Sequence, residues 1–178
     1  MLSSRLGHYR FLQWPVAGAI VLLFLGNCGF QPLHGRPGSG GGQTVTHMTY
    51  VAVATIPDRA GQLVRNELLD RLHAGGAAAK PVFRLTVQLK ESREGIAFQQ
   101  DDSATRFNLR LSARFELVDS RNGASLLKGH SRAIAAYNVV RSDYANLISE
   151  RDAQKRAANS VADGIQSQIA VFFSRRNG

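Results

Sequence analysis

Residues 106–117 constrain the fold most strongly, because apolar and polar side chains alternate along them without interruption. The apolar set is Phe107, Leu109, Leu111, Ala113, Phe115 and Leu117. The polar set is Arg106, Asn108, Arg110, Ser112, Arg114 and Glu116. Successive side chains of a β-strand point to opposite faces of its sheet. This period of two therefore predicts a strand with one face in a core and the other in water.

Two further strands are predicted beside this one. After Pro81, apolar residues alternate with polar ones through Phe83, Leu85, Val87 and Leu89. On the other side, Ser120–Gly123 contains the Asn-Gly pair that is favoured in hairpin turns, and a return strand is predicted from about Ser125 to Tyr137. A polar loop around residues 99–104 joins the first two of these strands.

An earlier β-rich run, Thr46–Ile56, is followed by a predicted helix that begins at Pro57–Asp58 with Asp58 as its cap. Gly75–Gly76 should end this helix. Its core-facing stripe consists of Val64, Leu68, Leu69 and Leu72. A long second helix is predicted to begin near Ser142 or Asp143. Its apolar stripe consists of Ala158, Val161, Ala162, Ile165, Ile169 and Phe172.

The predicted order of elements is therefore β-α-β-β-β-α. A strand–helix–strand succession favours a parallel crossover, and the hairpin adds antiparallel neighbours. This pattern predicts an α+β fold in which two helices pack on one face of a four-stranded mixed β-sheet. The core is expected to join the third strand to the last helix. The residues predicted to meet there are Phe107, Leu109, Leu111 and Phe115 on the strand and Val161, Ile165 and Ile169 on the helix.

Residues 1–27 have the composition of a secretory signal peptide. A basic head without acidic residues precedes an apolar run, Val16–Leu25, of the usual length for such a signal. A membrane-spanning helix needs about 20 apolar residues, so this run is too short to span. Cys28, the only cysteine, follows almost directly, and Leu25–Cys28 resembles the lipobox of bacterial lipoproteins. We therefore predict a lipid attached at Cys28, and no disulfide within the chain.

The predicted boundaries are a signal peptide at residues 1–27, a lipidated N-terminus with a glycine-rich tether at 28–44, a folded domain at 45–174 and a basic tail at 175–178. The signal contains two of the 22 basic residues and none of the 13 acidic ones, so the remaining chain carries a net charge of +7. Such a charge favours anionic partners, namely nucleic acid, anionic lipid or an acidic protein surface. Export argues against nucleic acid.

Four stretches of the chain together resemble the LptE family of lipopolysaccharide-assembly lipoproteins. These stretches are Cys28–Gly35, Arg65–Leu72, Ala104–Asp119 and Tyr137–Ala153. The family fold is two helices on a four-stranded mixed sheet, which agrees with the order predicted above. The resemblance implies a role in delivering lipopolysaccharide to the outer leaflet of the outer membrane, as plug and assembly partner of the LptD β-barrel. Gly29, in place of an aspartate after the lipidated cysteine, implies attachment to the outer membrane on its periplasmic side.

The exposed face of the predicted sheet carries the candidate binding residues. Arg106, Arg110 and Arg114 recur every fourth residue, so they should form one row, with adjacent members roughly 13 Å apart. Lys90 on the preceding strand, with Lys128 and Arg132 on the following strand, should flank this row. Arginine pairs bidentately with phosphate, the group that lipid A displays. We therefore expect contacts with lipopolysaccharide phosphates or with acidic residues of the barrel lumen.

No motif indicates an enzyme, a metal site or a cofactor. The histidines lack metal-ligand spacing, no Gly-x-Ser-x-Gly motif is present, and Asp101–Asp102 is expected to be a solvated turn. Two other classes of protein remain open at this stage. One is a periplasmic lipoprotein subunit of an ABC-type lipid transporter, and the weaker one is a basic nucleic-acid-binding module. Copurification with an outer-membrane barrel or with an inner-membrane permease would separate the two lipoprotein classes.

Overall fold

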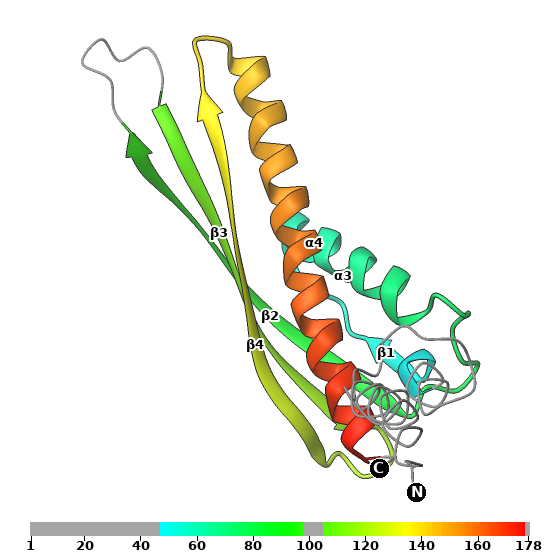
Figure 1. Cartoon of the computed structure of the whole chain (residues 1–178). Helices are drawn as coiled ribbons and strands as arrows, with labels where there is room; N and C mark the ends of the chain where they lie inside the picture. The colour runs from blue at the N-terminus through cyan, green and yellow to red at the C-terminus, as the bar shows by residue number, and fades with distance from the viewer. Residues whose placement is uncertain (1–46, 98–104, 177–178) are drawn as a thin grey trace, which may run out of the picture. The chain divides into compact units, whose positions relative to one another are not determined.

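The structure, a computed structural model, describes residues 47–97 and 105–176. The predicted signal peptide, Cys28, the glycine-rich tether and Asp101–Asp102 lie outside the described residues. The described elements follow the predicted order β-α-β-β-β-α (Figure 1). They are β1 (Val51–Val53), α3 (Asp58–Leu72), β2 (Phe83–Ala97), β3 (Thr105–Asp119), β4 (Ser125–Val139) and α4 (Asp143–Arg176). Among these helices, none is both long and apolar enough to cross a membrane.

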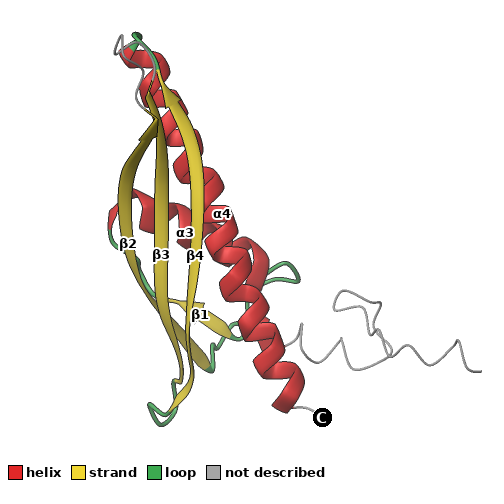
Figure 2. Cartoon of the chain, turned by 60° about the vertical axis from the view of Figure 1, so that its left-hand side comes forward, coloured by secondary structure: helices red, strands yellow, loops and turns green. Residues whose placement is uncertain are grey.

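The four strands form one mixed sheet, as predicted, and they lie in the order β1-β2-β3-β4. The short β1 runs parallel to β2, whereas β2 and β4 are both antiparallel to β3. The β3–β4 register begins at Thr105 opposite Val139 and continues through Leu111 opposite Ala133. Figure 2 shows the three long strands side by side, with β1 confined to one end of the sheet.

Both helices cover the same face of this sheet, and the core lies between the two layers (Figure 1). On β3, Leu109, Leu111 and Phe115 are buried, as the alternation predicts. They share one hydrophobic cluster with Val161, Ile165 and Ile169 of α4, each of which has no exposed surface. The helices are also joined by an ion pair between Arg71 Nε and Asp163 Oδ1 at 2.6 Å. The α+β fold class with both helices on one face is therefore confirmed.

Phe107 is an exception to the predicted core, because its side chain is half-buried rather than buried. Phe107 lies near the start of β3, at the open end of the β3–β4 hairpin. At this end α4 covers the sheet and α3 does not (Figure 1). The Phe107 ring stacks on Tyr137 of β4, with ring centroids 5.7 Å apart. Alternation identified the correct face of the strand but could not tell how far the helices extend over it.

The helix-facing side of β2 becomes polar toward the same end. Glu91 and Arg93 follow Leu89 on this side, and Arg93 pairs with Glu150 of α4 at 2.6 Å. Gln154 of α4 donates to the Glu91 carboxylate at 3.2 Å and is 9% exposed. Side-chain pairing, rather than apolar packing, therefore joins α4 to β2 beyond the reach of α3.

Three local predictions were wrong in detail. The first strand is Val51–Val53 rather than Thr46–Ile56, since residues 47–49 are helical. Asp58 does not cap α3: it is the first helical residue, at φ 66°, and Pro57 occupies the cap position without a side-chain hydrogen bond. In α4, Phe173 rather than Phe172 is fully buried, because the stripe continues from Ile169 by a step of four.

The turn and helix-end signals were confirmed. Gly123 has φ 72°, as the Asn-Gly turn requires, and its N–H donates to the Asp119 carbonyl at 2.8 Å. The helix α3 ends at Leu72, and Gly76 just beyond it has φ 95°. The last helix begins at Asp143, within the predicted interval.

Candidate functional site

The polar positions of β3 lie on the sheet face that the helices leave uncovered. Arg106 and Arg114 are exposed, and the side chain of Arg110 is 41% exposed. In the register, Arg110 is opposite Ser92 of β2 and Ile134 of β4. We call this surface the basic face and define it by the six cations of the sequence analysis. They are Lys90, Arg106, Arg110, Arg114, Lys128 and Arg132.

Three of these cations, Lys90, Arg114 and Arg132, lie closer together than neighbouring arginines of the row on β3 do. Lys90 of β2 and Arg132 of β4 both lie opposite Ser112 of β3, so Lys90, Ser112 and Arg132 form one row across the sheet. Arg114 follows Ser112 by two residues on the same face of β3. With strands about 4.8 Å apart and a rise of about 3.4 Å per residue, Lys90 and Arg132 lie on the order of 10 Å apart with Arg114 between them along the strand.

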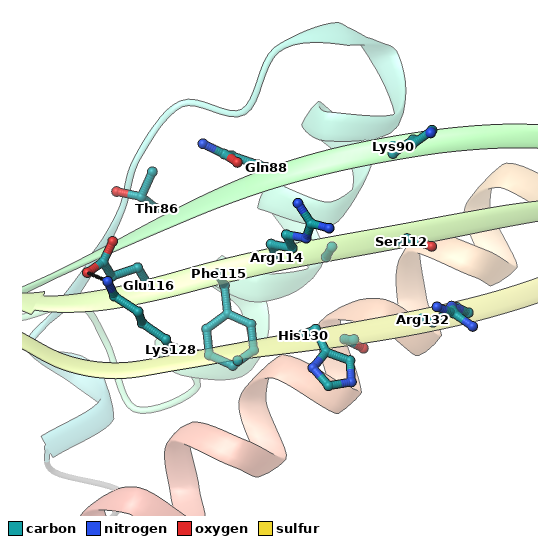
Figure 3. Close-up of a pocket in the computed structure, with 13 residues that line it drawn as sticks. Thr86, Gln88, Lys90, Ser112, Arg114, Phe115, Glu116, Lys128, His130 and Arg132 are labelled. Atoms are coloured by element: carbon teal, nitrogen blue, oxygen red, sulfur yellow. Dashed lines mark ion pairs between the residues drawn. The ribbon is translucent and has the colours of Figure 1, made fainter.

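A shallow hollow of about 800 Å³ lies on this part of the basic face (Figure 3). Polar side chains from all three long strands line it. They include Gln88 and Lys90 of β2, Ser112 and Arg114 of β3, and Lys128, His130 and Arg132 of β4. The hollow is open and is surrounded by charged and polar side chains, which suits an anionic group held at a surface and not a small apolar molecule enclosed in a cavity.

The close approach of β3, β4 and α4 beneath this hollow depends on Gly129. A Cβ atom at this position would lie 2.5 Å from Cζ of Phe115 and 2.6 Å from Oε1 of Gln168. The Phe115 ring therefore occupies the space that a side chain at 129 would need. Gln168 of α4 also donates to the His130 carbonyl at 2.9 Å, which fixes this part of β4 against the helix.

Two of the six cations have acidic partners. Lys128 Nζ lies 3.4 Å from Glu116 Oε1, and Figure 3 shows the two side chains in contact. A hydrogen bond from the Ser125 side chain is the main cause that lowers the pKa of Glu116, and the interaction with Lys128 lowers it further. Arg110 Nη2 lies 3.3 Å from Glu94 Oε2, a partner on β2 that the sequence analysis did not anticipate. Both Glu94 and Glu116 therefore interrupt the basic face.

The other four cations, Lys90, Arg106, Arg114 and Arg132, make no ion pair with any other described residue. Three of them surround the hollow. Like charges this close repel one another unless an anion lies between them. A phosphate at this position would reduce that repulsion and accept bidentate hydrogen bonds from arginine.

Two features of the surface were missed from the sequence. His130 lies opposite Arg114 and lines the hollow, and its spacing of two from Lys128 and from Arg132 could have identified it. At the far end of the domain, large apolar side chains are exposed around the β4–α4 turn. They are Val140, Tyr144, Leu147 and Ile148, with exposures of 44 to 74%. The sequence signal that could have identified them is the group of apolar residues at the start of α4, which precedes the core-facing stripe of that helix.

No group of three histidine, cysteine or acidic side chains within residues 47–97 and 105–176 could hold a metal ion. The helices cover one face of the sheet, and an open, partly uncompensated basic surface lies on the other face. This arrangement defines a domain of the α+β class.

A sequence profile of the LptE family, described as lipopolysaccharide-assembly, matches residues 46–169. This match covers more than half of the chain, so the chain belongs to the LptE family. A search among curated proteins gives no match. A solved protein from Caulobacter crescentus CB15 that is described as a putative lipoprotein is similar, with 27% identity, a TM-score of 0.65, and coverage of 76% of this chain and 98% of that one. A minor lipoprotein from Acinetobacter baumannii has 18% identity, a TM-score of 0.49, and coverage of 68% and 91%.

Proposed function

We propose that this protein is an outer-membrane lipoprotein that assembles lipopolysaccharide at the cell surface, as plug and assembly partner of an LptD-like β-barrel. Membership of the LptE family is the observation that carries this proposal. The lipid on Cys28 would hold the domain on the periplasmic side of the outer membrane. A similar solved protein that is described as a lipoprotein supports the anchor.

The basic face is the surface proposed to contact lipopolysaccharide phosphates or acidic residues of the barrel lumen. Lys90, Arg114 and Arg132 are exposed, surround one hollow and lack acidic partners among the described residues. Arg110 and Lys128 are already paired, so they should contribute less to the binding of an anion. Arg106 lies near the start of β3, opposite Asn138, and extends the basic face toward the open end of the β3–β4 hairpin.

Charge removal at the hollow tests this surface. The variant Lys90→Gln, Arg114→Gln, Arg132→Gln should bind purified lipopolysaccharide more weakly than the parent and with less dependence on salt. A matched control removes the same charge from exposed helix positions through Arg59→Gln, Arg151→Gln and Lys155→Gln. The control should bind as the parent does. Equal loss in both variants would show that only the net charge of the protein matters.

The partnership is tested by capture of the full-length lipoprotein from detergent-solubilised envelopes, followed by mass spectrometry. Recovery of a large outer-membrane β-barrel supports the proposal. Recovery of an inner-membrane permease complex instead would favour the ABC-type transporter subunit and would overturn the LptD-like partnership.

The anchor is tested by metabolic labelling with palmitate. The parent should incorporate the label, whereas Cys28→Ala should remain an unlabelled, unprocessed or mislocalised precursor. Label that persists on the Cys28→Ala variant would contradict attachment at this residue.

A further inference from the structure

The described chain begins at the same end of the domain at which α4 finishes. The His47 ring stacks on Phe173 in the last turns of α4, with ring centroids 5.5 Å apart. The Tyr50 carbonyl accepts hydrogen bonds from the N–H groups of Val82 and Phe83 at 3.0 and 3.1 Å. These contacts fix the first described residues to this end, which also holds the β3–β4 turn (Figure 1). We call it the tether end and define it by residues 47–50, 120–124 and 171–176.

Two apolar hollows flank the last turns of α4 at the tether end. The first, of about 700 Å³, is lined by Leu126, Leu127, Val171, Phe172, Arg175 and Arg176, among others. The second, of about 460 Å³, is lined by His47, Tyr50, Val82, Phe173, Arg121 and Arg176, among others. Val171 is 40% exposed and Tyr50 is 37% exposed, so apolar surface remains open to solvent on both sides of the helix.

Arginines stand beside this apolar surface. Arg121 is occupied, because it donates to both carboxylate oxygens of Asp119, at 3.0 and 2.6 Å. Arg175 and Arg176 form no ion pair within the part of the chain that the structure describes. Cations in the last turn also suit the helix dipole, but the dipole does not account for the open apolar walls next to them. Apolar side chains next to arginines match the acyl–headgroup boundary of an anionic bilayer.

The length of chain before His47 indicates which end of the domain lies near the membrane. Residues 29–46, 18 in number, separate Cys28 from His47. A glycine-rich chain of this length has a root-mean-square span of about 21–25 Å. The 34-residue helix α4 is about 51 Å long. A lipid on Cys28 would therefore keep the tether end near the leaflet, and the exposed apolar turn around Tyr144 away from it.

We propose that the tether end docks on the anionic phospholipid leaflet that holds the anchor. The two apolar hollows lie against the headgroup–acyl boundary, and Arg175 and Arg176 contact phospholipid phosphates. This docking is a second membrane attachment that orients the domain, and it rests on the proposed lipid at Cys28. It uses residues on the opposite side of the fold from the basic face.

The experiment uses the full lipoprotein in vesicles, with a polarity-sensitive fluorophore on one engineered cysteine. The thiol of Cys28 is blocked by its lipid, so Val171→Cys provides the reactive thiol. Tyr144→Cys, which is 27 residues and about 40 Å earlier along α4, is the matched control. In phosphatidylethanolamine–phosphatidylglycerol vesicles, the label at 171 should shift to the blue and be quenched by lipid-borne quenchers. The label at 144 should do neither.

Arg175→Gln with Arg176→Gln should reduce the equilibrium constant for docking, measured with the label at 171, by about 25-fold, from about fivefold for each arginine near an anionic surface. Replacement of phosphatidylglycerol by phosphatidylcholine should have a similar effect. The proposal is overturned if the labels at 171 and 144 behave alike. It is also overturned if the signal at 171 needs added lipopolysaccharide, or if it rises with protein density as a contact between copies would.

Failure of this docking and failure of the proposed function have different signatures. Mass spectrometry of the purified protein reports the lipid on Cys28 directly, and an unmodified thiol would overturn both the anchor and the docking. The Arg175→Gln, Arg176→Gln variant should still bind lipopolysaccharide and capture the barrel. Loss of those two activities with the label at 171 unchanged would reassign the two arginines from the bilayer to the barrel or to lipopolysaccharide.

Discussion

Truncation of two phenylalanines on β3 tests how the helices cover the sheet. Sequence alternation treats Phe107 and Phe115 as equivalent, but Phe115 is 3% exposed whereas Phe107 is half-buried. Removal of a buried phenylalanine ring typically costs about 3–5 kcal/mol, because it removes apolar burial and leaves a cavity. Phe107→Ala should cost about 1.5–2.5 kcal/mol, which combines partial burial with loss of the stacked pair with Tyr137.

Urea unfolding of the folded domain, followed by circular dichroism, measures both values. Phe115→Ala should lower the free energy of unfolding by roughly 1–3 kcal/mol more than Phe107→Ala. The total stability of a domain is about 5–15 kcal/mol, so this difference should be visible in the midpoint and in a melting temperature lower by several degrees. Equal losses, or a greater loss for Phe107→Ala, would show that α4 covers the far end of the hairpin more completely than the structure indicates.

Two further substitutions test the turn and the close approach beneath the basic face. Gly129→Ala should destabilise the parent by about 1–3 kcal/mol, because its Cβ meets the Phe115 ring, and should cost less when combined with Phe115→Leu. Additive effects in the double-mutant cycle would contradict the clash. Hydrogen bonds and charge from Arg121 lower the pKa of Asp119 from 3.8 to about 2, so this carboxylate stabilises the fold above about pH 4 and loses that effect as the pH falls toward 2. Asp119→Asn should therefore melt below the parent at about pH 6 and approach it at about pH 2, and a constant difference in melting temperature would argue against the ion pair.

The sequence was sufficient for the order of elements, because each signal was local. Alternation along residues 106–117, the Asn-Gly turn at 122–123 and the glycines after Leu72 each depend on a few adjacent residues. The mixed sheet followed from these signals through general rules of connection. The same reasoning misjudged Phe107 and Thr46–Ile56, where the outcome depends on how far other elements extend over the segment.

The basic face was predictable only in part, for a related reason. Periodicity placed Arg106, Arg110 and Arg114 on one face, but it carried no information on the partners that each finds across the sheet. Pairing Arg110 with Glu94 requires the β2–β3 register, which runs without a shift from Phe83 opposite Asp119 to Gly95 opposite Phe107. The compact group formed by Lys90, Arg114 and Arg132 likewise becomes visible only when all three strands are aligned.

The most direct test of the proposed role is a cycle between the basic face and the phosphates of its ligand. Binding of the parent and of the Lys90→Gln, Arg114→Gln, Arg132→Gln variant is measured against lipopolysaccharide and against the same lipopolysaccharide after removal of the lipid A phosphates. If the hollow holds a phosphate, each change alone weakens binding, and the two together weaken it little more than either one. Independent, additive losses from the two changes would contradict phosphate binding at this face.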